Sequence, residues 1–182
     1  MRQARQREGS LTFLARRVTD VNIDRIGAAA NFVARFYAVP ILAALAVCSP
    51  LMVLGYPDGH DWIFELVRIA EYRESLDSSQ GIPFWAVNQY QGFGSPIFLY
   101  YAPLYSALSS LLMFGGLSVI SAATVVLIVS SVAGAVGVTG LVREFLVGEQ
   151  GEAVSAARVA GVAYALSPYL VANALIRNAS AE

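Results

Sequence analysis

Acidic side chains are concentrated in one segment of the chain, PDGHDWIFELVRIAEYRESLD, which covers residues 57–77. It holds six of the thirteen Asp and Glu residues, and apolar segments of membrane length lie on both sides of it. Asp61, Glu65 and Arg68 follow one another at i, i+4 and i+7, so they would share one face of a helix. Such carboxylates can accept a proton from a hydroxyl group, and a neighbouring arginine can bind a phosphate. Asp61 and Glu65 are therefore candidate catalytic residues.

Each of these residues also has a purely structural interpretation. Asp61 would favour a helix amino terminus through the helix dipole, and the pattern alone supports this as strongly as catalysis. Glu65 would pair with Arg68 on a solvated face, and the pattern alone favours this interpretation. His60, between Asp58 and Asp61, would help to hold a divalent metal, but no spacing in the sequence fixes a third or fourth ligand. We therefore assign no metal ligands.

The composition is that of a membrane protein. Of the 182 residues, 57% are apolar and 14% are charged, and the mean hydropathy is +0.58. Soluble domains carry about 25% charged residues, and the apolar residues here occur in blocks rather than in alternation. No basic tract is interleaved with aromatic residues, so nucleic-acid binding has little support. The expected fold class is therefore an all-α integral membrane protein.

Uncharged segments predict three membrane-spanning helices, at about residues 36–57, 117–142 and 159–176. Seven arginines precede the first span, which predicts a cytoplasmic segment at 1–35 and a membrane domain at 36–182. This orientation in the cell membrane places the loop 58–116 outside and the loop 143–158 inside. A cleaved signal peptide is the less favoured interpretation, because the charged leader is long and further apolar segments follow.

The outer loop is predicted to contain two helices that lie at the membrane surface, residues 61–77 and 102–114. The first would turn an apolar face toward lipid or the helix bundle, formed by Trp62, Ile63, Leu66, Ile69 and Ala70. Eight aromatic residues fall between positions 84 and 105, a density typical of the head-group level. The second helix is short for a crossing, and a four-span arrangement in which it does cross is the alternative.

The three-span arrangement brings the end of the chain to the same side as the acidic segment. Arg177 and Glu182 would then emerge near Asp61 and Glu65. Such a group of residues suits an anionic, lipid-linked substrate, because an arginine can bind a phosphate through two hydrogen bonds while a carboxylate accepts a proton.

Three separated blocks of the sequence resemble a known family: GHDWIFELVRIAEY, GIPFWAVNQYQGFGSPIFLYYAPLYSAL and VAYALSPYLVANALIRNASAE. In this order they look like the amino-terminal part of the 6-pyruvoyl-tetrahydropterin-synthase-related membrane proteins, which are similar in turn to the GT-C glycosyltransferases. The resemblance covers about residues 36–182. It implies a polytopic helical bundle of GT-C type that transfers a sugar from a polyprenyl-phosphate carrier to an extracytoplasmic acceptor.

The resemblance also implies roles for single residues. Asp61 matches the essential acidic residue of the first outer loop and becomes the candidate base, whereas family members often carry histidine at the position of Glu65. Arg177 and Glu182 match an Arg-and-Glu block after a later helix, and Arg177 would bind the carrier phosphate. Tyr100 and Tyr101 complete the predicted substrate-binding set.

GT-C proteins have many more spans than three. We therefore expect the 182-residue chain to be the amino-terminal portion of a longer enzyme and to be inactive as this piece. We also expect its helices to pack against further membrane helices or a partner. The alternative is a non-catalytic membrane scaffold or a transporter-associated subunit. The predicted spans contain no acidic, basic or histidine residue, which argues against transport.

Overall fold

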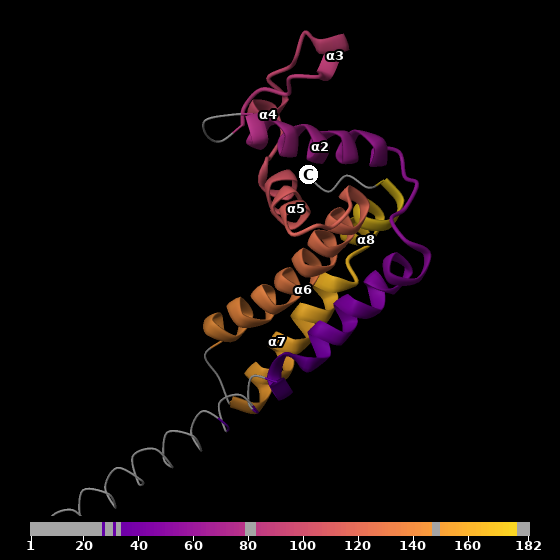
Figure 1. The fold of residues 1–182 in the computed structure, drawn as a ribbon. Helices are drawn as coiled ribbons and strands as arrows, with labels where there is room; N and C mark the ends of the chain where they lie inside the picture. The colour runs from indigo at the N-terminus through magenta and orange to yellow at the C-terminus, as the bar shows by residue number, and fades with distance from the viewer. Residues whose placement is uncertain (1–26, 28–30, 32–33, 79–82, 147–149, 178–182) are drawn as a thin grey trace, which may run out of the picture. The chain divides into compact units, whose positions relative to one another are not determined.

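The computed structural model describes residues 27, 31, 34–78, 83–146 and 150–177. Within these residues the chain is helical, and its only β-type pairing is an isolated antiparallel bridge between Ala86 and Ser95. The chain divides into two compact units, residues 1–39 and 40–182. The second unit contains the acidic segment and most of the described helices, which are labelled in Figure 1.

In the part of the chain that the structure describes, three helices are long and apolar enough to cross a membrane, as the sequence predicted. They are Ala34–Leu54, α6 at Val119–Phe145 and the stretch Glu152–Ile176, with 21, 27 and 25 residues. A helix needs about 20 apolar residues to cross the hydrocarbon core. The third stretch combines most of α7, Gln150–Ala165, with α8, Pro168–Ala172, and the π-helix η1, Asn173–Arg177.

The polar segment 143–158 was wrongly predicted to be a loop. α6 continues to Phe145 and α7 begins at Gln150, so Arg143 and Arg158 both lie in helices. The physical reason is that backbone hydrogen bonding extends a helix beyond its apolar run into water. An arginine in the last turn, such as Arg143 in α6, also interacts favourably with the helix dipole.

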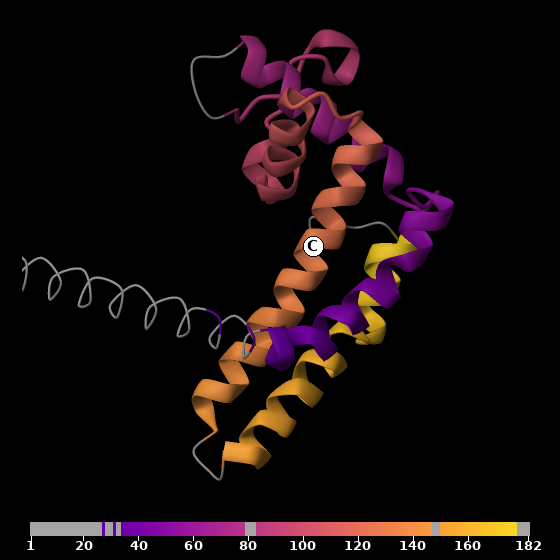
Figure 2. The same cartoon turned by 60° about the horizontal axis from the view of Figure 1, so that its bottom comes forward.

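Small residues bring α6 and α7 into close contact, and Figures 1 and 2 show the two helices side by side. On α7 the buried positions Ala157, Gly161 and Ala165 follow one another every four residues. Gly161 lies so close to Thr139 and the carbonyl of Ala135 on α6 that a Cβ there would overlap both. Such spacing of small residues lets helix backbones approach closely in a membrane, where the hydrophobic effect does not drive helices together.

The third stretch breaks between α7 and α8. The amide of Leu166 still donates to the carbonyl of Val162 at 2.9 Å, but Pro168 has no amide hydrogen to continue the ladder. Pro168 instead occupies the first turn of α8, where a missing donor costs nothing. The break redirects the chain just after the small-residue contact with α6 ends at Ala165.

The segment between the first span and α6 forms a group of shorter helices. These are α2 at Trp62–Ser78, α3 at Gln89–Gly92, α4 at Ile97–Tyr100 and α5 at Leu104–Phe114. α2 packs on α5, and both contact α6. The eleven residues of α5 span roughly 16 Å at 1.5 Å per residue, about half of the hydrocarbon thickness. This length supports the three-span arrangement over the four-span one.

Candidate functional site

The charged stripe on α2 is turned into the protein. Glu65 is 1% exposed and Arg68 is 7% exposed, and both lie against neighbouring helices of the second unit. Ile69, which follows them on α2, belongs to a core cluster with Cys48, Tyr105 and residues of α6. The outer face of α2 is apolar instead, since Ile63, Phe64 and Val67 are between 43% and 63% exposed.

This division differs from the predicted one. We expected Ile63 and Ile69 to share a single apolar face, but Ile69 is fully buried while Ile63 is half exposed. An amphipathic pattern identifies two faces but not the environment of each. Here α2 packs against α5 and α6 and buries three of its six charged residues, Glu65, Arg68 and Glu71, while apolar residues of the opposite face lie on the surface.

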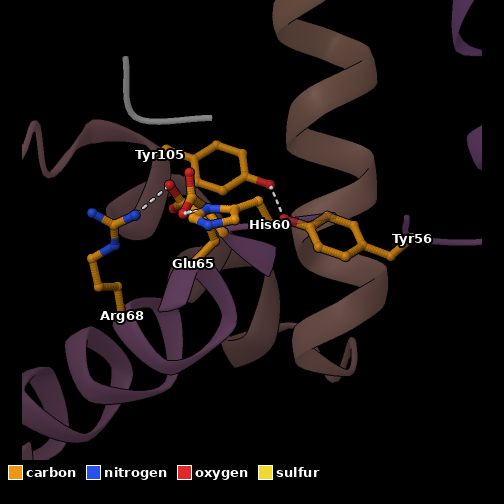
Figure 3. Close-up of polar contacts among 6 residues, drawn as sticks. Tyr56, His60, Glu65, Arg68 and Tyr105 are labelled. Carbon is orange, nitrogen blue, oxygen red and sulfur yellow. Dashed lines mark hydrogen bonds and ion pairs between the residues drawn. The ribbon is translucent and has the colours of Figure 1, made fainter. Parts of the chain in front are cut away.

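Glu65 and Arg68 form an ion pair within α2, one helical turn apart (Figure 3). The guanidinium of Arg68 also lies over the ring of Tyr101, 4.4 Å from the ring centroid. A cation in this position is attracted by the negative face of the aromatic ring. Within the described residues the Nε atom of Arg68 is buried and has no hydrogen-bond acceptor. The predicted pairing of Glu65 with Arg68 is confirmed, but its predicted place on a solvated face is wrong, because both side chains are buried.

Two tyrosine hydroxyls join this region to α6. The hydroxyl of Tyr105, on α5, donates a hydrogen bond to the carbonyl of Ala123 at 3.0 Å. It also lies 3.4 Å from the hydroxyl of Tyr56, in the segment that follows the first span (Figure 3). Tyr105 is 7% exposed, so its hydroxyl would be costly to leave without partners.

Asp61 lies at the start of α2 and remains in contact with solvent. Its side chain is 25% exposed and hydrogen-bonds to Nδ1 of His60 at 2.7 Å, and the imidazole of His60 is 84% exposed. The backbone carbonyl of Asp61 accepts the amide hydrogen of Glu65 at 3.0 Å, which begins the helix. A carboxylate that is oriented by a neighbour and reachable from water can act as a base.

Of the predicted substrate-binding residues, the structure describes the side chains of Tyr100 and Tyr101. Tyr101 contacts Arg68, whereas Tyr100 is 79% exposed. Arg177 is the last residue of η1, and its side chain lies outside the described residues together with Glu182. Their convergence with Asp61 therefore stays a prediction.

The candidate metal site near Asp58, His60 and Asp61 gains no third ligand in the structure. Among the described residues, no three His, Cys, Asp or Glu side chains gather closely enough to hold a metal ion. His60 and Asp61 contact each other, and Asp58 is exposed.

Two polar side chains of α2 that the sequence did not single out attach this helix to the segment that follows it. The carboxylate of Glu71 accepts the amide hydrogen of Asn88 at 3.1 Å, and the hydroxyl of Ser75 donates to the carbonyl of Trp85 at 3.0 Å. Both side chains are buried. They continue the stripe of Glu65 and Arg68 along α2, so helical spacing extended by two more turns would have found them.

Comparison with protein-family models, with curated proteins and with solved structures found no match to this chain. Any function proposed for the chain therefore depends on the geometry of the site.

Proposed function

We propose that the chain is part of a membrane glycosyltransferase, which moves a sugar from a polyprenyl-phosphate carrier to an acceptor outside the cell membrane. One observation carries the proposal: the solvent-accessible Asp61–His60 pair begins the same helix that holds the buried Glu65–Arg68 pair. This helix lies between two of the helices that are apolar enough to cross a membrane. Because α2 falls between two candidate spans in the chain, its reactive groups would lie near the lipid phase, where a lipid-linked substrate resides.

Asp61 is the proposed base. As the acceptor hydroxyl attacks the anomeric carbon of the sugar, Asp61 takes the hydroxyl proton. The bond between that carbon and the carrier phosphate breaks, and the phosphate leaves with the bonding electrons. The hydrogen bond from His60 would orient the carboxylate toward the acceptor. Arg177, with Glu182, is proposed to bind the carrier phosphate as the resemblance implies.

Glu65 takes a positioning role in this proposal. It is 1% exposed and ion-paired, so it has no access to an acceptor hydroxyl. Its pairing with Arg68 fixes the first turns of α2, and Arg68 in turn contacts Tyr101 from the aromatic segment. The pair would thereby keep Asp61 in a fixed position relative to the aromatic segment, residues 84–105.

The test is sugar transfer by the protein expressed from its gene and reconstituted in liposomes with a radiolabelled polyprenyl-phosphate sugar. Asp61→Asn should lower transfer by about 100-fold or more, the usual contribution of a general base. Asp77→Asn is the matched control, since Asp77 ends the same helix, is half exposed and pairs with Arg73. Transfer by Asp61→Asn at the control's rate, with both variants inserted equally, would exclude Asp61 as the base.

A second candidate is a non-catalytic membrane scaffold. It is favoured by the exposed apolar residues of the outer loop, which include Phe64 on α2 and Leu111 on α5, 63% and 60% exposed. Such residues could contact further helices of a membrane assembly. Absence of transfer by the wild-type protein, together with a stable stoichiometric complex in mild detergent, would support this candidate.

A further inference from the structure

A cavity of about 200 Å³ lies among the three helices that are apolar enough to cross a membrane. Ala44 and Cys48 of the first helix form one wall, and Leu127 and Ser131 of α6 form another. The third wall comes from the end of α7 and from α8 and η1. The cavity is distinct from the Asp61 site, because none of its lining residues belongs to α2 or to the aromatic segment.

The cavity follows from the break in the third stretch. Up to Ala165 the small residues of α7 keep that helix close to α6, and the ring of Tyr164 packs directly on Gly134. Beyond Ala165 the proline at 168 starts a new helix, and the small-residue contact is lost. Two helices that diverge after a close contact leave a gap between them, which larger side chains have not filled here.

The lining is uncharged and mostly apolar. No lining residue is acidic, basic or histidine, and eight of the fourteen are aliphatic. The polar side chains in the lining are Ser130, Ser131, Tyr164, Tyr169 and Asn173. The hydroxyl of Ser131 donates to the carbonyl of Leu127 at 2.9 Å, so it does not require a partner from the cavity. A water molecule needs two to four polar partners in such a space. Because the polar side chains are a minority and most of the lining is aliphatic, the cavity favours an occupant that is itself apolar.

Size and access narrow the choice of occupant. A cavity of about 150 Å³ lined by aliphatic side chains is known to take up benzene, so the present one has room for a short stretch of hydrocarbon chain. An α-helix, about 10 Å across, is too wide to enter it. Tyr169, at its edge, is 60% exposed, which places the opening on the outer surface of these helices.

We propose that this cavity binds one acyl chain of a membrane phospholipid, which enters sideways from the bilayer at Tyr169. Phospholipid chains surround any helix that crosses a membrane, so they are present at very high local concentration. A bound chain restores the dispersion contacts that the lining atoms would otherwise lack. The head group stays outside, since no lining residue carries a charge that would bind it.

Photocrosslinking tests the proposal with the full chain in phosphatidylcholine nanodiscs. One sample contains a trace of phosphatidylcholine with a diazirine near the end of an acyl chain, and the other contains the same lipid with the diazirine in the head group. After irradiation, peptides are mapped by mass spectrometry. The chain-labelled lipid should mark residues 127–131 and 164–175 several-fold more than exposed positions elsewhere on the spans, such as Val53, which is 80% exposed. The head-group label should not mark the cavity.

Two serine variants provide a matched comparison. Ser131→Leu places a larger side chain in the cavity and should reduce labelling several-fold. Ser49→Leu makes the same change outside it, where the hydroxyl likewise bonds to a carbonyl one turn earlier, and should leave labelling unchanged.

Even labelling of all spans, or equal labelling of both variants, would overturn the proposal. So would labelling of the cavity by a diazirine-bearing isoprenoid but not by the phospholipid. If Ser131→Leu does not fold, the comparison of chain and head-group labels in the wild type still decides.

Discussion

Glu65 and Arg68 are ion-paired in the interior of the protein, and both side chains come from the same face of α2. Burial of two charges is expensive, and their attraction offsets this cost only while both are present. The ring of Tyr101 adds a cation–π contact to the guanidinium of Arg68. The packing of α2 against its neighbours therefore depends on the presence of both charges.

Removal of one member of this pair should be far more harmful than removal of both. We expect Glu65→Leu or Arg68→Met alone to lower the free energy of unfolding by about 3–5 kcal/mol, because each leaves an uncompensated buried charge. The double variant Glu65→Leu/Arg68→Met should lie near the wild type. Thermal or denaturant unfolding followed by circular dichroism in detergent would measure all three.

The Arg73–Asp77 pair on the same helix is the control. Its side chains are 24% and 51% exposed, so water screens the interaction. Asp77→Asn should therefore change stability by only about 0–1 kcal/mol. Equal costs for the single variants at both pairs would contradict the special role of the buried one.

The sequence predicted where the helices form better than it predicted which face of each helix is buried. Uncharged length was enough to find the spans, because each helix must satisfy its own backbone in lipid. Helical spacing put Asp61, Glu65 and Arg68 on one stripe and suggested the pairing of the last two, which the structure confirms. It could not say which face of α2 is buried, since that depends on α5 and α6, which are distant in sequence.

Other features depend on contacts that no local pattern encodes. The π-helix η1 and the cavity beside it depend on how the third stretch packs against α6 and the first helix. Tyr105 was counted among the aromatic residues of the membrane surface. Its hydroxyl instead bonds to Ala123 inside the protein, a pairing across 18 residues of chain.

The three-span arrangement predicts opposite accessibility for the two ends of α6. Ser118, exposed at its amino-terminal end, should lie outside with Gln91, and Glu144 near its carboxyl-terminal end should lie inside. Single cysteines at these positions in a Cys48→Ala background can be labelled in intact cells with a membrane-impermeant maleimide. Labelling of positions 91 and 118 but not 144 is the expected result. Labelling of 144 alone would reverse the orientation, and separation of 91 from 118 would mean that α5 crosses.

Tyr72 should make the protein less stable at alkaline pH. Burial raises the pKa of its phenol above the ordinary value of about 10, so the folded state keeps a proton that the unfolded chain loses. Stability is therefore complete below about pH 10 and falls as the pH rises above it. Tyr72→Phe keeps the ring contact with Phe98, whose centroid lies 5.0 Å away, and should reduce this alkaline loss.

Melting temperatures measured from about pH 8 to about pH 11, on both sides of the ordinary tyrosine pKa, would reveal the effect. Tyr100→Phe serves as the control, because Tyr100 is 79% exposed whereas Tyr72 is buried. An alkaline loss that is the same in wild type and Tyr72→Phe would assign it to other groups.

Gly161 should tolerate no side chain. A Cβ at this position would lie 2.9 Å from both the carbonyl oxygen of Ala135 and Cβ of Pro40, and would overlap the hydroxyl of Thr139. Gly161→Ala should therefore force α6 and α7 apart and lower the free energy of unfolding by about 1–3 kcal/mol, the usual cost of overpacking. Gly137→Ala is the matched control, since a Cβ there meets no atom within 4 Å. It should be neutral or stabilise α6 by about 0.5–1 kcal/mol, because alanine restricts the unfolded chain more than glycine does. Equal stability of the two variants in detergent would show that the close contact at Gly161 does not hold α6 and α7 together.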